Sequence, residues 1–239
     1  MADLESFSAD DLPDLGDAIR GFANSARSME HAANLVADLL WDQLRDAEGE
    51  PACALLRVYK THRFKRLPDD LQAFARDLLD ADPPPDTRCL SLLATRGVEP
   101  AWNDRRQSEG HKAIPLPSSE FVQRLPMVAG LIEQLGLSIE DVVQPSPDRK
   151  RIVELAQRTY DVFHVADAQG SSYVPAQGFV ERYGVRSALG FGGVLFTGDF
   201  FAVVLFSRVP LSPAVADTVR ILSLATRVAL MPFGTRVFD

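Results

Sequence analysis

The sequence has few of the features that mark a disulfide-bonded or membrane-spanning chain. Only two of its 239 residues are cysteines, Cys53 and Cys89, and both lie in apolar runs, where a buried free thiol is the usual state. The longest unbroken apolar run, from Phe200 to Phe206, is far shorter than the roughly 20 residues that cross a bilayer. Acidic residues occupy the start, where a signal peptide would be basic and then apolar. We therefore expect a cytoplasmic protein without a membrane segment.

The sequence also lacks the motifs of metal sites and of common enzymes. The four histidines are His31, His62, His111 and His164. No two of them have the spacing of metal ligands, and neither cysteine has a histidine close by in the sequence. There is no Gly-x-Ser-x-Gly motif. The glycines of Gly190–Gly193 run into the strand-like Val-Leu-Phe rather than a Lys-Ser/Thr helix start, so they indicate close backbone approach in a sheet and not a phosphate loop. Neither a metal site nor an enzyme is expected.

Composition and charge indicate a folded chain with unevenly placed charge. Apolar residues make up 46% and charged residues 24%, which are ordinary values for a globular protein. The net charge of −8 argues against general binding of nucleic acid. Residues 1–50 hold 12 acidic and 3 basic residues (net −9), and residues 51–239 hold 21 and 22 (net +1). We therefore divide the chain into an acidic helical arm, residues 1–48, and an α/β domain, residues 49–239.

Both ends of the chain carry apolar residues at helical spacing. From Leu15 to Leu44 they follow steps of 4-3-4-3-4-3-4-4, which predicts one helix of about eight turns. After Ser212 and Pro213, a usual helix entry, similar 4-3 steps predict a C-terminal helix. A long helix with such a stripe packs on its own domain or pairs with a second chain.

The middle of the chain carries strand signals. Six strands are predicted near residues 53–60, 89–96, 112–116, 160–167, 186–196 and 200–208. Helices are predicted over 67–79 and 119–135, and residues 138–151 are predicted to form a polar connector. The expected fold is α+β, with a twisted, mostly antiparallel sheet, terminal helices on one face and capping segments on the other. Its core should include Leu56, Val58, Leu92, Ile114, Val162, Leu189, Val203 and Leu205.

The stretch from Tyr183 to Leu230 resembles the C-terminal half of a GAF domain, a sensory module of bacterial signal transduction. Ser187–Phe196 matches a strand of small residues, Gly198-Asp199 a hairpin turn and Phe201–Ser207 an apolar last strand, and a long helix follows from Pro213. The resemblance is good over about residues 175–232 and loose over 15–170. It implies a GAF-like sheet with ligand-capping helices on one face and terminal helices that pair across a dimer.

Departures from the family's patterns narrow the ligands that this resemblance implies. The Asn-Lys-Phe-Asp-Glu set of cyclic-nucleotide-binding relatives is absent. Both cysteines lie on predicted strands, outside the pocket cap to which relatives attach bilin. Cyclic nucleotide, bilin and zinc are therefore not expected. Some GAF sensors hold haem through one histidine, and His164 in the apolar stretch Tyr-Asp-Val-Phe-His-Val-Ala-Asp is the candidate. A neutral imidazole bonded to a backbone carbonyl is the favoured alternative.

The segment from Ala168 to Val185 places small polar residues beside aromatic ones, as small-molecule pockets do. In a GAF-like fold it would pack over the sheet where ligands bind. We predict ligand contacts by His164, Ser171, Ser172, Tyr173, Gln177 and Tyr183. The alternative is a well-packed loop whose hydroxyl groups cap the following helix.

Five cations fall within ten residues: Arg57, Lys60, Arg63, Lys65 and Arg66. A nucleic-acid surface would combine them with the aromatic residues Tyr59 and Phe64. The acidic net charge favours either a solvated strand end and loop or a surface that pairs with acids of the N-terminal helix. A docking patch for another protein stays open.

These observations favour a non-catalytic sensory or regulatory module that binds a small ligand or a signalling protein and signals through its terminal helices. The alternatives are a dimerisation or docking module without a ligand, and a haem-binding sensor. Because two stripes offer more apolar surface than one sheet face needs, we expect a homodimer. Its predicted interface contains Ile19, Phe22, Met29, Val36, Val219 and Leu222.

Overall fold

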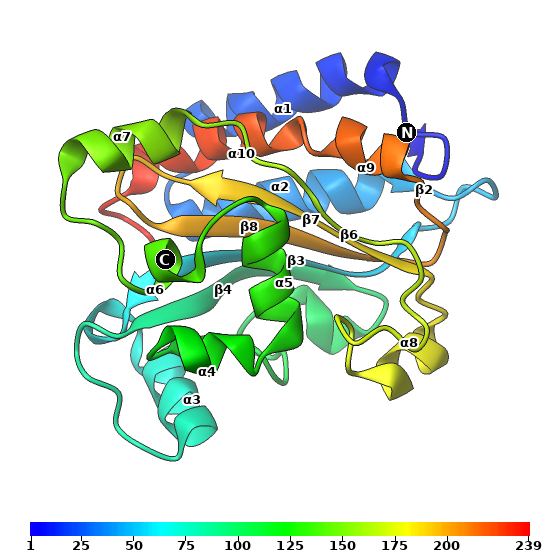
Figure 1. The fold of residues 1–239 in the computed structure, drawn as a ribbon. Coiled ribbons are helices and arrows are strands. Elements are labelled where there is room, and N and C mark those ends of the chain that lie inside the picture. Colours follow the sequence, from blue (N-terminus) through cyan, green and yellow to red (C-terminus); the bar gives the residue numbers. More distant parts are fainter.

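The computed structural model describes residues 1–239 and is built on one six-stranded antiparallel sheet (Figure 1). The strand order is β5-β4-β3-β8-β7-β6, and every neighbouring pair is antiparallel. The strands are β3 (Cys53–Arg63), β4 (Arg88–Gly97), β5 (Ala113–Leu116), β6 (Phe163–Val165), β7 (Ser187–Val194) and β8 (Phe200–Ser207). Two short parallel strands, β1 (Ala2–Asp3) and β2 (Leu44–Arg45), pair separately. The predicted α+β sheet is confirmed.

One face of the sheet is covered by the helices from both ends of the chain (Figure 1). They are α1 (Leu12–Ser25), α2 (Met29–Gln43), α9 (Pro213–Val219) and α10 (Leu222–Leu230). Their apolar residues form one core with alternate residues of β3 and β8, where Leu56 pairs with Leu205 and Val58 with Val203. The predicted arm and the C-terminal helix therefore share a core with the sheet, and no result tests the proposed domain division at residue 48.

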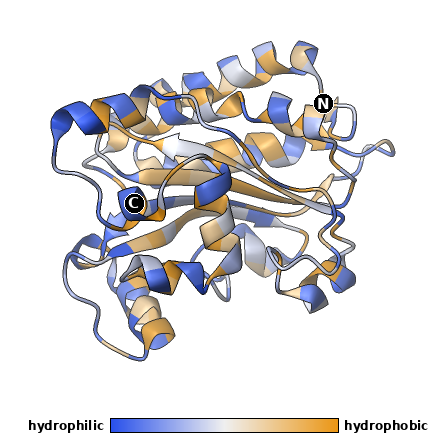
Figure 2. Ribbon diagram, viewed as in Figure 1, coloured by the Kyte–Doolittle hydropathy of each residue, from blue (hydrophilic) through white to orange (hydrophobic).

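The opposite face carries the central helices and a core of its own. These helices are α4 (Ser119–Gln123), α5 (Pro126–Gln134), α6 (Ile139–Val143), α7 (Arg149–Gln157) and α8 (Gln177–Tyr183). The helix α3 (Asp69–Leu79) packs beside β5 over a small third cluster. Figure 2 shows the result: apolar strands lie between helices that are striped apolar and polar. The residues predicted to form the core are buried, except Val162, which is half-buried against the first core.

The prediction of one eight-turn N-terminal helix is wrong, because the helix breaks between α1 and α2. Ala26 has an extended backbone, and the Ser28 side chain accepts a hydrogen bond from the amide of His31 at 2.9 Å, which starts a new helix. The apolar stripe continues across the break because both helices bury the same face in one core.

Three other predicted elements also differ. The predicted C-terminal helix breaks at Arg220 and Ile221, which separate α9 from α10. The helix predicted over 119–135 is divided because Pro126 starts α5 and disfavours helical backbone at the residue before it. The predicted polar connector 138–151 contains α6 and the start of α7, each capped by the side chain of the residue just before it, Ser138 or Asp148.

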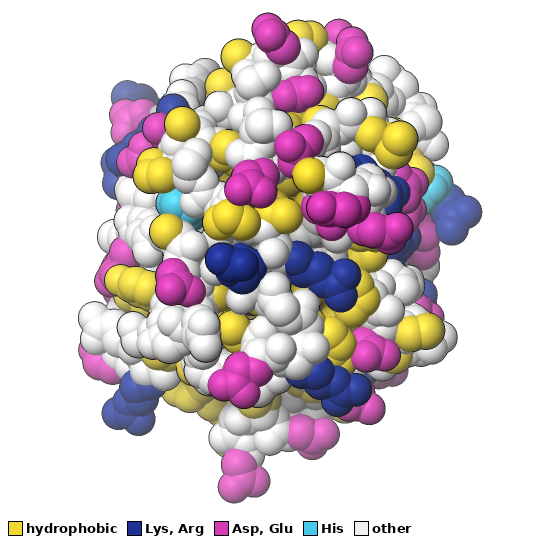
Figure 3. Space-filling view, turned by 90° about the vertical axis from the view of Figure 1, so that its right-hand side faces the viewer, with side chains coloured by type: hydrophobic (Ala, Val, Ile, Leu, Met, Phe, Trp, Pro, Cys, Tyr) yellow, Lys and Arg dark blue, Asp and Glu magenta, His cyan; other side chains and the backbone are white.

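The acidity of the first 50 residues is visible at the surface. Figure 3 shows acidic side chains spread over the upper part of one side of the molecule, where α1 and the start of the chain lie in Figure 1. No helix combines the length and the apolar composition needed to span a membrane.

The shared core of the terminal helices predicts a large difference between two methionines. Met29 is fully buried and Met231 is 46% exposed. Met29→Ala should lower the free energy of unfolding by about 2–5 kcal/mol, because it removes buried methylene groups and leaves a cavity. The control Met231→Ala should change it by about 0.5 kcal/mol or less. Urea denaturation measures both, and equal effects would contradict the packing of α2.

Candidate functional site

Most of the predicted ligand residues make contacts within their own segment. The Gln177 side chain accepts a hydrogen bond from the Gly170 amide at 2.8 Å and donates to the Ala168 and Val174 carbonyls. The Ser171 hydroxyl accepts from the Tyr173 amide at 3.2 Å. Ser172 is exposed. The polar groups of Gln177 and Ser171 are thus already bonded within this segment.

The two tyrosines of this group pack against neighbouring elements. The Tyr173 ring meets the Phe163 ring edge-on, with 6.1 Å between centroids, and lies so close to Gly130 that a Cβ there would come within 2.6 Å of it. The Tyr183 hydroxyl donates to Glu99 at 2.9 Å, and its ring contacts Trp102. Whether a ligand binds at this segment stays a prediction.

The sixth predicted residue, His164, lies on the other side of the sheet. Its neighbours Phe163 and Val165 belong to the core under α5, and side chains alternate along a strand. The His164 Nε2 atom is 2.9 Å from the Leu211 carbonyl oxygen. The structure therefore does not bring His164 together with Tyr173, and its imidazole has the backbone partner that the alternative interpretation expected.

The predicted dimer residues lie inside the single chain. Ile19, Met29, Val36, Val219 and Leu222 are at most 1% exposed, and Phe22 packs against the same core. If two chains pair, other residues must form the contact.

The basic run Arg57–Arg66 does not form one solvated surface, so that expectation is wrong for its first two cations. Arg57 is buried, and its guanidinium donates to the Ser108 hydroxyl at 3.0 Å and to the Tyr59 hydroxyl at 3.1 Å. Lys60 is only 2% exposed and points to the opposite face, in the row of Leu56 and Val58.

A polar hollow begins at Lys60. This cleft, which we call the cationic cleft, has a volume of about 610 Å³ and lies between the end of β3, the start of β4, the β7–β8 turn and the last residues of the chain. Five cations and one carboxylate line it; its residues are Lys60, His62, Arg63, Arg66, Arg88, Thr197, Asp199, Gly234, Thr235, Arg236, Val237 and Phe238.

Asp199, at the β7–β8 turn, is the carboxylate of the cleft and holds two cations. It accepts from Lys60 Nζ at 2.8 Å and from the Arg88 guanidinium. Burial alone would raise the pKa of Asp199, but Lys60 and Arg88 outweigh it, and the pKa lies below its ordinary value. Burial lowers the pKa of Lys60, and Asp199 opposes that shift. Asp199 therefore compensates buried charge at the end of the sheet.

His62 follows Lys60 on the same face of β3 and has no hydrogen-bond partner. Its side chain is 5% exposed, and neither Nδ1 nor Nε2 is bonded. The Phe238 ring lies over it, with 5.1 Å between the ring centroids. Burial lowers the pKa of His62 well below its ordinary value, and Lys60 adds to this. A buried polar group without a partner is uncommon and here lines a charged cleft.

Three further cations surround the opening of the cleft. Arg63 is exposed and pairs with Asp86 at 2.9 Å. Arg66 and Arg236 are exposed, and their guanidinium groups form no ion pair or hydrogen bond within the chain. These two groups are available to an anion.

The wall formed by residues 234–238 also caps helix α2. The first two amides of α2 donate to this segment, Met29 to the Arg236 carbonyl at 3.0 Å and Glu30 to the Val237 carbonyl at 2.8 Å. These amides have no acceptor inside their own helix. The wall of the cleft is thus joined directly to a helix of the first core.

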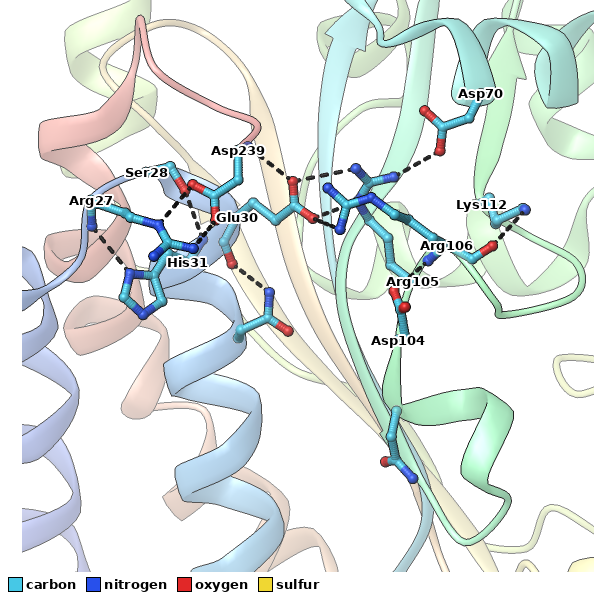
Figure 4. A network of polar contacts seen from close by, with 12 residues as sticks. Arg27, Ser28, Glu30, His31, Asp70, Asp104, Arg105, Arg106, Lys112 and Asp239 are labelled. Atoms are coloured by element: carbon cyan, nitrogen blue, oxygen red, sulfur yellow. Dashed lines mark hydrogen bonds and ion pairs between the residues drawn. The ribbon is translucent and has the colours of Figure 1, made fainter.

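A buried ion pair holds this junction in place (Figure 4). Glu30, on α2, accepts from Arg105 Nε at 2.8 Å, and Arg105 also contacts Asp70 at 3.0 Å. Glu30 further accepts from the Asp239 amide at 3.2 Å, and the Arg105 guanidinium lies 5.3 Å from the Phe238 ring centre. One side chain of α2 therefore connects α3, the loop before β5 and the wall of the cleft.

Only part of this site could be predicted from the sequence. It marked Lys60, Arg63 and Arg66 as a basic run and Asp199 as a turn residue, but nothing in their spacing showed that they meet. Arg88 and Arg236 are isolated charges in the sequence, 148 positions apart. Groups of three or more potential metal ligands are absent, and burial raises the pKa of both Cys53 and Cys89 to about 12.

Comparisons with known proteins give no information about the candidate site. No protein-family model matches the chain, and no curated protein matches it. Among solved structures, the chain is similar to the GAF domain from a phosphoenolpyruvate-protein phosphotransferase (ptsP) from Coxiella burnetii, with 13% identity, a TM-score of 0.45 and 93% of each chain covered. The α+β arrangement expected from the sequence is present, with one antiparallel sheet between two layers of helices. This similarity assigns no ligand or activity to the chain.

The state of His62 predicts how stability depends on pH. Unfolded His62 takes up a proton near pH 6.5, whereas the folded residue does so only at much lower pH, so the unfolded chain binds more protons in that interval. The free energy of unfolding should fall as the pH drops below about 6.5, by up to about 1.4 kcal/mol per pH unit from this residue.

Urea denaturation between about pH 5 and pH 7.5 measures this slope. His62→Gln should reduce it, and the control His31→Gln, at the start of α2, should leave it unchanged. Equal slopes in wild type and His62→Gln would show that His62 is not held neutral.

Proposed function

We propose that this chain is a non-catalytic regulatory module whose cationic cleft binds a small phosphate-bearing anion. The observation that carries the proposal is the composition of the cleft, in which five cations and an unpartnered buried histidine surround one carboxylate. Its volume of about 610 Å³ lies within the roughly 300–1,000 Å³ range of small-molecule pockets. The acidic net charge of the whole chain does not oppose local binding, because a cleft lined by one sign of charge attracts its counter-ion.

Two pairs of cations and the neutral His62 have different parts in this binding. Arg66 and Arg236 present free guanidinium groups, which bind phosphate oxygens in bidentate fashion. Lys60 and Arg88 stay fixed by Asp199 and add positive potential at the floor of the cleft. A neutral imidazole has one donor and one acceptor nitrogen, so His62 can bond both an anionic oxygen and a hydroxyl group of the ligand.

The regulatory part of the proposal rests on the wall of the cleft. Arg236 lines the cleft with its side chain, and its carbonyl accepts from the amide of Met29 in α2. The helix α2 shares one core with α1, α9 and α10. A ligand that contacts Arg236 would favour the arrangement in which residues 234–238 cap α2, and it acts by this difference in contacts. The signal then passes to the terminal helices.

Pyrophosphate is a suitable probe for the cleft. Isothermal titration of the full chain should show saturable binding of one pyrophosphate, which weakens as sodium chloride is added, because salt screens exposed charges. Arg66→Gln and Arg236→Gln should each weaken binding about tenfold, which corresponds to about 1.4 kcal/mol.

The control for this experiment is Arg124→Gln, which removes an exposed arginine that directly follows α4 and does not line the cleft. It should bind pyrophosphate like the wild type. If the three variants are equally affected, the interaction is a general attraction to arginine, and if pyrophosphate does not bind, the proposed function is wrong.

We also propose that the module forms a homodimer through its terminal helices, on a surface different from the predicted one. Two large apolar residues at the start of α10, Ile221 and Leu224, form a second stripe on its outer side, and each is 53% exposed. The buried stripe of α10 faces the core, so this second stripe is unpartnered within the chain. A two-fold pairing would place it against its own copy.

Light scattering at tens of micromolar chain measures this pairing. The wild type should have the mass of a dimer, and Leu224→Glu should have the mass of a monomer, because a charge replaces an apolar contact. Val153→Glu is the control, since it adds the same charge at an exposed apolar residue of α7. A wild-type monomer would refute the dimer and leave the cleft proposal untouched.

A further inference from the structure

A second hollow lies at the break in the C-terminal helix. It has a volume of about 210 Å³ and is bounded by the junction of α9 and α10, by the residues before β6 and by β7 and β8. It shares no residue with the cationic cleft. Its walls combine apolar side chains, among them Tyr160, Phe201 and Leu224, with three arginines, Arg158, Arg220 and Arg227.

The break that borders this hollow has no proline or glycine to cause it. Between α9 and α10 the amides of Ile221, Ser223 and Leu224 donate to carbonyls three residues earlier, at 3.0–3.3 Å, so the chain forms a tighter turn than an α-helix. Such a turn within a helix often marks a functional site or a sequence under strain.

The inner wall of the hollow depends on a glycine of β7. A Cβ at Gly193 would come within 2.6 Å of the Tyr160 ring, so only glycine lets this ring lie flat against the strand. The Tyr160 hydroxyl is turned away and donates to the Leu155 carbonyl at 2.7 Å. An aromatic face therefore lines the hollow beside Phe201, which is 1% exposed.

The three arginines give the hollow a positive charge, and no carboxylate is among its lining residues. Arg220 Nε is buried and has no hydrogen-bond acceptor, and the nearest carboxylate oxygen, of Asp217, is 3.7 Å away. The Arg158 guanidinium has no ion pair and lies 5.8 Å from the Tyr160 ring centre. Arg227 bonds the Ala156 carbonyl, and burial lowers its pKa. Arg158 is exposed and Arg220 is half-buried, so both guanidinium groups are accessible to an anion.

We infer that this hollow binds a small aromatic carboxylate. An apolar cavity of roughly 150 Å³ is large enough to bind benzene, so about 210 Å³ holds one ring with a carboxylate group. The ring would lie between Tyr160, Phe201 and Leu224. The carboxylate would accept from Arg220 Nε and Arg158, because the planar guanidinium matches a carboxylate in shape and charge. Bound there, it would join the helix break to the segment before β6.

Benzoate is the probe, and the neutral benzyl alcohol is its matched control. Ligand-observed NMR and titration calorimetry on the full chain should show saturable binding of one benzoate, with Kd on the order of 0.1–1 mM. Benzyl alcohol should bind at least about tenfold more weakly, because it cannot pair with a guanidinium. Light scattering in the same samples records the oligomeric state.

Two variants locate the site. Arg220→Gln and Arg158→Gln should each weaken benzoate binding about tenfold, and neither breaks a hydrogen bond made by the wild-type side chain. Arg66→Gln, in the cationic cleft, should bind benzoate normally. The inference is overturned if benzoate does not saturate, if benzyl alcohol binds equally well, or if Arg66→Gln weakens benzoate binding as much as Arg220→Gln does. The pyrophosphate titration is independent of all three results.

Discussion

The structure depends on the need to cover a sheet that is apolar on both faces. The central strands β3 and β8 are buried along almost their whole length, so neither face can meet water. The helices from the two ends of the chain cover one face, and the central helices cover the other. Burial of two cores of this kind supplies the main favourable free energy of folding. It also explains why the long N-terminal stripe breaks into α1 and α2: two shorter helices on one face bury the same apolar residues.

Charged side chains lie at the end of the sheet, where the helices no longer cover its apolar face. At the end of β3 the row Leu56, Val58 continues as Lys60 and His62, so the apolar face becomes a charged one within four residues. Buried cations need a counter-charge, and Asp199 supplies it from the neighbouring turn. The remaining cations face the cleft, and residues 234–238 close its side while they cap α2. The cleft and the terminal helices are therefore parts of one packing arrangement.

The two hollows differ in size and in the chemistry of their lining. The cationic cleft is polar and wide, suited to a phosphate-bearing ligand with several charges. The hollow at the helix break is small and partly aromatic, suited to a single carboxylate on a ring. Both touch the terminal helices, the first through the cap of α2 and the second through the junction of α9 and α10.

The sequence by itself determined the strands, most of the core and the α+β class, because these follow from local patterns such as the unbroken apolar run Phe200–Phe206 and the turn at Gly198. It also showed the basic run and the free, buried cysteines. Only the tertiary structure decided where the helices break. The breaks near Ser28 and Arg220 depend on how the helices pack as well as on local helix propensity. It alone brought Asp199 to Lys60 and Arg88, placed Arg236 beside Arg66, and turned His164 away from Tyr173. The physical reason is that a site is made by contacts between residues far apart in the chain, and charge, spacing and periodicity carry no information about which distant residues will meet.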